Sequence, residues 1–329
     1  MTSGRLRGWQ STILAYAGAL LMFALTSLYS PGFAAPSHLR SLIVVSAFTG
    51  IVALGQTLVV ISGGIDLSVP WVLNSAAILV TLIARGADAP LLWAVPLVVA
   101  GGALVGAVNG AGIAWAGIPP IVMTLSTNTI LQGLLLVATG GSPPPTTPAA
   151  LQMMATGRVG PVPVILLIWL ALAAAATLLL GRTVLGRYLY ALGSARMVAE
   201  FSGVPVRRVS MSAYVVSGAT AAFAGVLLTG YSGQAYLGMG DPYLFTSIAA
   251  VAIGGASILG GTGTYLGTMA GALALTILTG LLAIFRLSNG ALLVIYGVVI
   301  LLTVSTATPA MQSALAWAGR RGNGWRRHR

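Results

Sequence analysis

Residues 40–61 read RSLIVVSAFTGIVALGQTLVVI, and residues 62–68 read SGGIDLS. The first stretch is apolar over the roughly 20 residues that a helix needs to cross the hydrocarbon core of a bilayer. The second stretch interrupts it, because its adjacent glycines permit an irregular backbone and Ser68 is a favoured residue at a helix N-terminus. Pro70 also suits the first turn of a helix. The two stretches predict a membrane helix, a break in the backbone and then a second helix.

The composition of the whole chain agrees with a membrane protein. Of 329 residues, 57% are apolar and 6% are charged, whereas about 25% are charged in an average soluble chain. The mean hydropathy is +0.96. A soluble enzyme of this length needs far more polar surface. The net charge of +12 does not indicate nucleic-acid binding, because the Arg residues lie between apolar blocks rather than on one surface.

Residue types that the chain lacks exclude several kinds of chemistry. It has no Cys, so disulfides and Cys-based metal sites are excluded. Its two His residues lie far apart, which disfavours a metal centre. It has no Lys, and a standard phosphate-binding loop needs one. We therefore expect a transport subunit with no cofactor and no metal, which leaves ATP hydrolysis to another chain.

We expect an all-α, polytopic transmembrane bundle of about ten spans, with broken or re-entrant helices, forming one domain over residues 1–329. The first apolar run is longer than the core of a signal peptide, at roughly 7–15 residues, which favours an uncleaved span. Segment 243–258 is short enough to be re-entrant, and glycines could bend or break segment 91–116. The expected spans are 11–30, 40–61, 68–84, 91–116, 120–139, 162–181, 209–230, 243–258, 264–284 and 290–307.

The distribution of Arg predicts the orientation. With the N-terminus inside and ten spans, twelve Arg residues fall inside and four outside, as the positive-inside rule requires. Both termini are then cytoplasmic, as are a loop at 182–208 and a basic tail at 308–329, while the loop at 140–161 lies outside. The inside set is Arg5, Arg7, Arg182, Arg187, Arg196, Arg207, Arg208, Arg320, Arg321, Arg326, Arg327 and Arg329, and the outside set is Arg40, Arg85, Arg158 and Arg286.

Polar residues within apolar spans are candidates for a transport pathway or gate, because polar side chains in lipid usually face the bundle or a cavity. Thr124, Asn128 and Gln132 recur at every fourth position and share one stripe of a helix. Asp66 either caps a helix at the membrane surface or marks a break in the pathway wall. The other polar candidates could equally serve to form hydrogen bonds between neighbouring helices. The full candidate set is Gln56, Gly63, Gly64, Asp66, Ser68, Asn74, Asn109, Thr124, Asn128 and Gln132.

Four stretches of the sequence resemble one family, the permease subunits of ABC importers for ribose, xylose and galactose. Gly63–Ser68 is similar to the family's GGIDLSVG signature, although Pro70 stands where the family usually has Gly. The stretch 120–127 resembles PFIVTLGT, and 253–263 resembles IGGTSLFGGRG. The stretch 186–193 with 202–204 resembles the cytoplasmic GRYIYAIG and SGI motifs. These matches lie in order over about residues 41–300.

The predicted cytoplasmic loop contains a second group of candidates. Residues 195–201 could form a short helix with Arg196 and Glu200 on one face, which Gly203 and Pro205 would end. Without the family resemblance, these residues indicate only an ordinary basic loop. The resemblance implies a coupling helix that binds a partner ATPase. Met197 and Glu200 depart from the family's usual residues in this loop. The candidate coupling residues are Arg187, Arg196, Ala199, Glu200 and Gly203.

The resemblance implies a multi-pass permease subunit of a bacterial inner-membrane ABC importer for sugar transport. Its partners would be ABC ATPase subunits, an extracytoplasmic solute-binding protein and a second permease copy, in a homodimer or heterodimer. No span contains a pair of buried acids, which favours a neutral, polyhydroxylated solute such as a monosaccharide. The alternatives are a permease of the branched-chain amino-acid type, a standalone ion-coupled carrier and a membrane-embedded enzyme. Which sugar is moved does not follow from the sequence.

Overall fold

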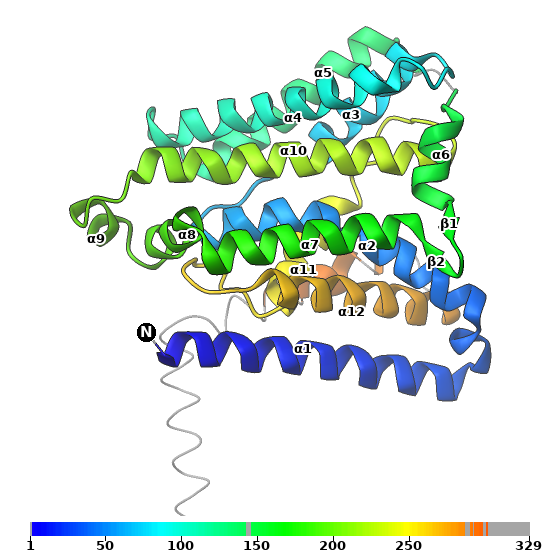
Figure 1. The fold of residues 1–329 in the computed structure, drawn as a ribbon, viewed down its shortest axis with the longest axis horizontal. Coiled ribbons are helices and arrows are strands. Elements are labelled where there is room, and N and C mark those ends of the chain that lie inside the picture. Colours follow the sequence, from blue (N-terminus) through cyan, green and yellow to red (C-terminus); the bar gives the residue numbers. More distant parts are fainter. Residues whose placement is uncertain (1, 143–145, 287–289, 292, 299–300, 302–329) are drawn as a thin grey trace, which may run out of the picture.

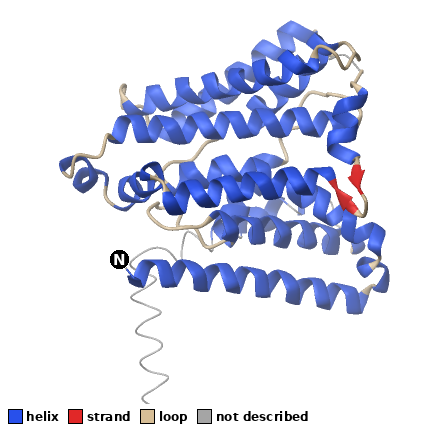
Figure 2. Cartoon of the chain, viewed as in Figure 1, coloured by secondary structure: helices blue, strands red, loops and turns tan. Residues whose placement is uncertain are grey.

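The computed structural model describes residues 2–142, 146–286, 290–291, 293–298 and 301, and these residues are almost entirely helical (Figures 1 and 2). One antiparallel pair of strands, β1 (Arg158–Val159) and β2 (Val162–Pro163), is the exception. The helices are α1 (Thr2–Tyr29), the 3-10 helix η1 (Pro31–Ala34), α2 (Pro36–Ile61), α3 (Val69–Ala84), α4 (Leu91–Ala114), α5 (Pro120–Thr139), α6 (Ala149–Thr156), α7 (Val164–Arg182), α8 (Val184–Ser194), α9 (Arg196–Phe201), α10 (Val206–Ser232), α11 (Tyr243–Ile253) and α12 (Tyr265–Ile284).

A polytopic helical bundle is confirmed. Among the described residues, seven helices are long and apolar enough to cross a membrane, namely α1, α2, α4, α5, α7, α10 and α12. Two more of the expected segments form shorter apolar helices, α3 with 16 residues and α11 with 11. At 1.5 Å per residue, α11 is about 16 Å long, roughly half the thickness of a hydrocarbon core. The tenth expected span lies partly, and the basic tail wholly, outside the described residues.

The long helices run side by side, with α10 at the centre of the bundle (Figure 1). Helix α10 packs against α2, α3, α4 and α6, and most of its residues are buried. Helices α8 and α9 lie at one end of the bundle, near the start of α1, and α6 with the strand pair lies at the opposite end. Both segments between spans that we expected to be loops are thus partly helical: 182–208 contains α8 and α9, and 140–161 contains α6.

The glycines of α4 do not break the helix, which was one of two possible effects that we considered for segment 91–116. Helix α4 is continuous from Leu91 to Ala114, and three of its glycines lie on the face that meets α10. A Cβ atom at Gly106 would overlap the backbone of Tyr214, and one at Gly110 would lie 2.6 Å from the Cα of Met211. The glycines therefore allow two membrane helices to approach closely, which is the usual role of small residues in membrane bundles.

This close approach predicts unequal effects of two otherwise identical substitutions in α4. Gly106→Ala places a methyl group against the α10 backbone, and overpacking of this kind costs about 1–3 kcal/mol. Gly101→Ala is the matched control, because a Cβ atom there meets nothing within 4 Å. We expect the Gly106 variant to unfold at a lower temperature in detergent and the Gly101 variant to match the parent protein. Equal unfolding temperatures for the two variants would contradict the described packing.

Candidate functional site

The break between α2 and α3 is built around one buried carboxylate. Helix α2 ends at Ile61, and Gly63 has a φ of +86°, a left-handed conformation that favours glycine. Asp66 is 1% exposed. One carboxylate oxygen accepts hydrogen bonds from the backbone N–H of Ser68 at 3.0 Å and from its hydroxyl at 2.6 Å. The other accepts from the hydroxyl of Ser217 in α10 at 2.7 Å. Asp66 therefore lies inside the bundle, where it accepts a bond from the backbone at the start of α3.

A chain of buried hydrogen bonds continues from Ser68 to two further helices. Asn109 of α4 donates from Nδ2 to the Ser68 hydroxyl at 2.9 Å. Thr127 of α5 donates to Oδ1 of Asn109 at 2.6 Å. Ser68 is the N-cap residue of α3, as expected, but its side chain makes no capping bond because it is engaged in this chain. The chain thus joins α3, α4, α5 and α10 through the residues of the break.

Two members of the predicted polar stripe in α5 bind the backbone at the start of α3. Thr124 is fully buried, and its hydroxyl accepts from the N–H of Leu67 at 3.0 Å. Oδ1 of Asn128 accepts from the N–H of Trp71 at 3.4 Å. These N–H groups belong to the break and to the first turn of α3, where no helical partner exists. Gln132, the third member, is exposed.

The remaining candidates lie in other buried positions. Asn74 of α3, in the amide orientation that satisfies both of its groups, donates to the carbonyl of Tyr236 at 3.0 Å and accepts from the N–H of Gly238 at 2.7 Å. It therefore holds the segment between α10 and α11. Gln56 is fully buried, and within the described part of the chain neither of its amide atoms has a partner. Gly64 lies against the hydroxyl of Tyr214, where a Cβ atom would overlap it.

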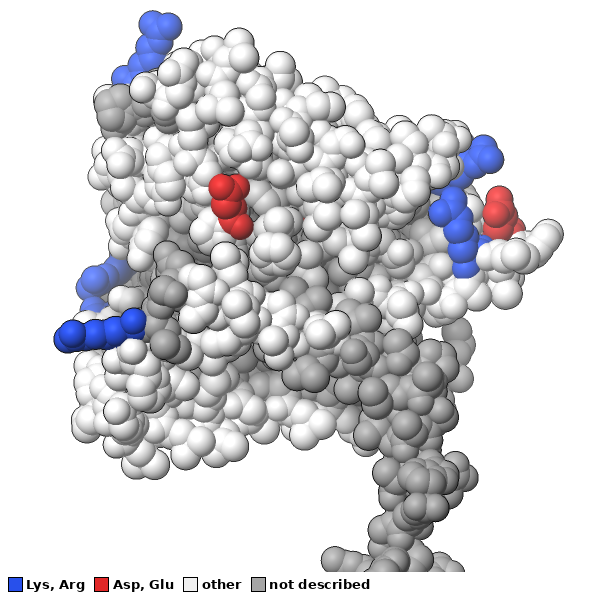
Figure 3. All heavy atoms as spheres, turned by 180° about the vertical axis from the view of Figure 1, so that it is seen from behind, with Lys and Arg blue, Asp and Glu red and all other residues white. Residues whose placement is uncertain are grey.

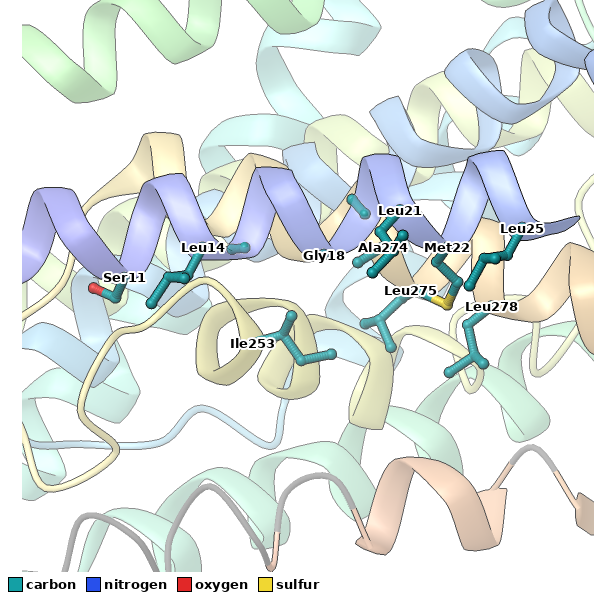
Figure 4. Close-up of a pocket in the computed structure, with 12 residues that line it drawn as sticks. Ser11, Leu14, Gly18, Leu21, Met22, Leu25, Ile253, Ala274, Leu275 and Leu278 are labelled. Atoms are coloured by element: carbon teal, nitrogen blue, oxygen red, sulfur yellow. The ribbon is translucent and has the colours of Figure 1, made fainter. Parts of the chain in front are cut away.

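Two cavities lie elsewhere, and none of the ten candidate residues lines either of them. One, of about 630 Å³, is an apolar groove between α1, α11 and α12 whose lining includes Leu14, Met22 and Leu278 (Figure 4). The other, of about 310 Å³, lies between α2, α11 and α12 and includes several hydroxyl groups. The candidates at the first break therefore support the backbone of the break and do not form the wall of a described cavity.

A second break, between α11 and α12, meets the first one at helix α8. The N–H of Gly261 donates to the carbonyl of Ile61 at 2.9 Å. Gly193 of α8 fits between these residues, where a Cβ atom would overlap the Ile61 carbonyl oxygen and lie 2.5 Å from the N of Gly261. The hydroxyl of Tyr190, also in α8, donates to the carbonyl of Gly263 at 2.7 Å. Helix α8 thus contacts both breaks at once.

Helix α9 presents a largely apolar surface to solvent at the same end of the bundle. Met197 is 71% exposed, Val198 64% and Phe201 86%. Arg196 and Glu200 are exposed beside them, whereas Ala199 is buried. The predicted short helix is present as Arg196–Phe201, and Gly203 follows it with a φ of +80°. Exposed apolar residues of this kind, next to charges, are typical of a surface that binds another protein.

Several residues of this arrangement were not among our sequence candidates. Ser217 and Thr127 complete the hydrogen-bond chain of Asp66, but each is one hydroxyl among many in apolar helices. Tyr190 and Gly193 lie within the GRYLYALG stretch that we had quoted. We had not assigned them a contact, because the sequence does not show which distant segment they meet.

Comparison with known proteins identifies the family. Residues 38–304 match the family described as "Branched-chain amino acid transport system / permease component". The chain belongs to this family. The match covers both breaks and helices α8 and α9, so the whole candidate site lies within the family's common region. A membrane permease with a transport role, of the kind that the resemblance implied, is confirmed.

Curated relatives share part of this region. The chain is 34% identical over 179 residues to "Autoinducer 2 import system permease protein LsrD" of Yersinia pestis (strain Pestoides F), covering 53% of this chain and 54% of that protein. The same protein of Yersinia pseudotuberculosis serotype O:3 (strain YPIII) matches with the same values. The chain thus spans about half the length of the curated relatives it matches. No solved structure matches the chain significantly.

The geometry of Asp66 predicts the effect of removing its charge. Asp66→Asn replaces one acceptor oxygen with an amide that can only donate, so one of the three donors around it loses its partner. An unsatisfied buried donor costs about 1–3 kcal/mol. We expect the variant to unfold at a lower temperature in detergent. Asp88→Asn is the control, because Asp88 is exposed and accepts one bond, from Ala150. An Asp66 variant as stable as the control would refute this role.

Proposed function

We propose that the chain is the permease subunit of a bacterial inner-membrane ABC importer that moves a monosaccharide or a similar neutral, polyhydroxylated solute. Its partners would be ABC ATPase subunits, an extracytoplasmic solute-binding protein and a second permease copy. The permease itself would carry out no hydrolysis. The family membership supports the class of protein, and the contacts of α8 support the route by which a partner ATPase would act on the bundle.

The observation that carries this proposal is the junction of α8 with both helix breaks. In the proposed complex the ATPase binds α9 through Met197, Val198 and Phe201, with Arg196 and Glu200 at the edge of the contact. Movement of α9 then displaces α8, with which it is nearly continuous in sequence. Gly193 and Tyr190 transmit this displacement to the backbone at Ile61 and Gly263. A docking surface and two breaks in the membrane region are thereby joined through a single helix.

We propose ten membrane crossings with both ends in the cytoplasm. Seven are the long helices. In two others a shorter helix combines with non-helical backbone: residues 62–68 lead into α3, and a segment that follows α10 leads into α11. The tenth is segment 290–307. The placement of α8, α9 and the start of α1 at one end of the bundle (Figure 1) supports the orientation.

The outward face of α5 supports a second permease copy. Ser126, Thr129 and Gln132 are all exposed on it, although polar side chains in membrane helices usually face other protein or a cavity. Gly133 adds a position where a neighbouring backbone can approach, since no described atom lies within 4 Å of a Cβ built there. We propose that this face meets the second copy, with Gln132 near the shared pathway.

We propose that eight of the ten candidate pathway residues act mainly as the framework of a gate. Asp66, Ser68, Asn109, Thr124 and Asn128 hold the break between α2 and α3 by hydrogen bonds. Gly63 and Gly64 give it the required backbone, and Asn74 ties α3 to the segment before α11. A gate built in this way changes conformation when its supporting helices move, and it does not bind solute through these side chains.

Two alternative functions can be distinguished by experiment from a sugar importer. The description of the family names branched-chain amino acids, so a leucine importer is the first alternative. Competition between labelled ribose and unlabelled leucine in cells that express the complete importer separates it from a sugar importer. A standalone carrier is the second, and uptake by liposomes that contain this chain alone would establish it.

The proposed orientation can be tested with single cysteines, because the chain has none of its own. Met197→Cys places a probe on exposed α9, and Ser142→Cys places one at the opposite end of the bundle. We expect a membrane-impermeant thiol reagent added to intact cells to label the probe at 142 and to leave the one at 197 unlabelled until the cells are opened. Labelling of position 197 in intact cells would reverse the orientation.

The proposed coupling route predicts different effects of two chemically identical changes in α8. Tyr190→Phe removes the bond to Gly263 without changing the shape of the helix. Tyr188→Phe is the matched control, because no hydrogen bond of its hydroxyl occurs among the described residues. We expect the Tyr190 variant to retain ATPase association and hydrolysis but to import at most one third of the solute per ATP. Equal coupling ratios for the two variants and the parent would exclude this contact from the route.

A further inference from the structure

The segment between α10 and α11 enters the bundle instead of remaining at its end. Gly233, with a φ of +73°, ends α10 just after Ser232. Gly240 then packs so closely on Pro70 that a Cβ atom would overlap the Pro70 carbonyl oxygen. Asn74 holds the backbone at Tyr236 and Gly238. Residues 236–242 therefore lie beside the first half of α3.

The position of residues 236–242 along the axis of the bundle can be judged by comparison with α10. The break that leads into α3 is bonded to Ser217, which precedes the end of α10 at Ser232 by 15 residues, or about 22 Å along the helix axis. The start of α3 is therefore near the middle of the bundle. Because residues 236–242 lie beside it, helix α11 also starts at about this depth, and its 11 residues lead toward α8.

Asp241 presents a carboxylate to the outside of the bundle at this depth. It is exposed, and its side chain lies close to that of Trp71. Figure 3 shows the Arg side chains gathered at the two ends of the bundle and one acidic side chain between them. An exposed carboxylate at membrane depth is costly in lipid, so it must face a water-filled path or another protein.

Three tyrosines flank Asp241 in the sequence, at positions 231, 236 and 243. Tyr236 is 47% exposed and Tyr231 42% exposed. Tyr243, two residues after Asp241, lies within electrostatic range of both. Aromatic rings present an apolar face with a polar tip, and the C–H faces of a sugar ring stack on such surfaces. A carboxylate accepts hydrogen bonds from the hydroxyl groups at the edge of the same ring.

The two residues that follow Asp241 in the chain, Pro242 and Tyr243, line the cavity of about 310 Å³. The lining also includes the hydroxyl groups of Thr49, Thr246, Thr276 and Thr279 and the apolar side chains of Leu42, Val45 and Leu275. A mainly apolar cavity with a few placed polar groups is typical of small-molecule sites, and its volume lies at the lower end of their range of about 300–1,000 Å³. An ion is a poorer fit, because the described residues contain no group of three metal-ligating side chains.

We propose that Asp241, Tyr236 and the adjacent cavity form a solute subsite of the permease, in which the carboxylate accepts hydrogen bonds from the hydroxyls of a sugar. This proposal rests on the proposed function. It differs from the gate at the first break, because these side chains contact the solute itself. The solute would reach the subsite between the two shorter helices, α3 and α11, where Pro70 in the first turn of α3 contacts Gly240, just before α11.

The first test uses the purified permease alone, in liposomes. Tyr236→Cys places a single thiol in the subsite, and Met197→Cys on α9 is the control. We expect ribose, xylose or galactose at millimolar concentration to slow the reaction of a thiol reagent at position 236 at least threefold and to leave position 197 unchanged. No protection at 236 by any of the three sugars, or equal slowing at both positions, would overturn the subsite.

The second test uses the complete importer and keeps the two proposals distinguishable. Asp241→Asn preserves the size of the side chain but removes its charge. We expect at least a tenfold loss of sugar imported per ATP, with hydrolysis within twofold of the parent, and no loss in Asp88→Asn. Import unchanged in Asp241→Asn would overturn the subsite while leaving the proposed function intact. A parent importer that takes up none of the three sugars would overturn both.

Discussion

Backbone polar groups in a hydrocarbon environment must find partners within the protein, and the architecture of this permease depends on that constraint. At the first break, the N–H groups of Leu67, Ser68 and Trp71 lie outside any helical ladder. Each is bonded to a side chain, from Thr124, Asp66 and Asn128 respectively. A continuous helix would need none of these side chains. The break can persist inside the bundle because neighbouring segments supply the acceptors.

The position of the helices was largely predictable from the sequence, because a span of about 20 apolar residues is a strong local signal. The signal for a break was equally local, since Gly63 and Gly64 directly follow the apolar run. The partners of the break were not predictable. Ser217 lies 151 residues from Asp66 along the chain, and its hydroxyl is indistinguishable by pattern from those that simply bond to their own helix.

The glycines of α4 show why a residue type alone does not predict its role. A glycine in an apolar helix is compatible with a kink, with a flexible point and with close packing of a second helix. The contact with α10 shows which of these three roles applies, and in α4 the glycines allow close packing. Segment 243–258, which contains α11, was ambiguous for a related reason. Its helix is too short to cross the membrane, and the depth at which it begins depends on Asn74, which belongs to a distant helix.

The bond between Ile61 and Gly261 has a consequence for biogenesis. The carbonyl of Ile61 is synthesised 200 residues before the N–H group that satisfies it, 261 minus 61. At about 5–20 residues per second, the ribosome needs about 10–40 s to produce the partner. During that interval the first three helices have left the ribosome with one polar backbone group unpaired. The nascent permease therefore depends on water or on the insertion machinery to shield this position until its second half arrives.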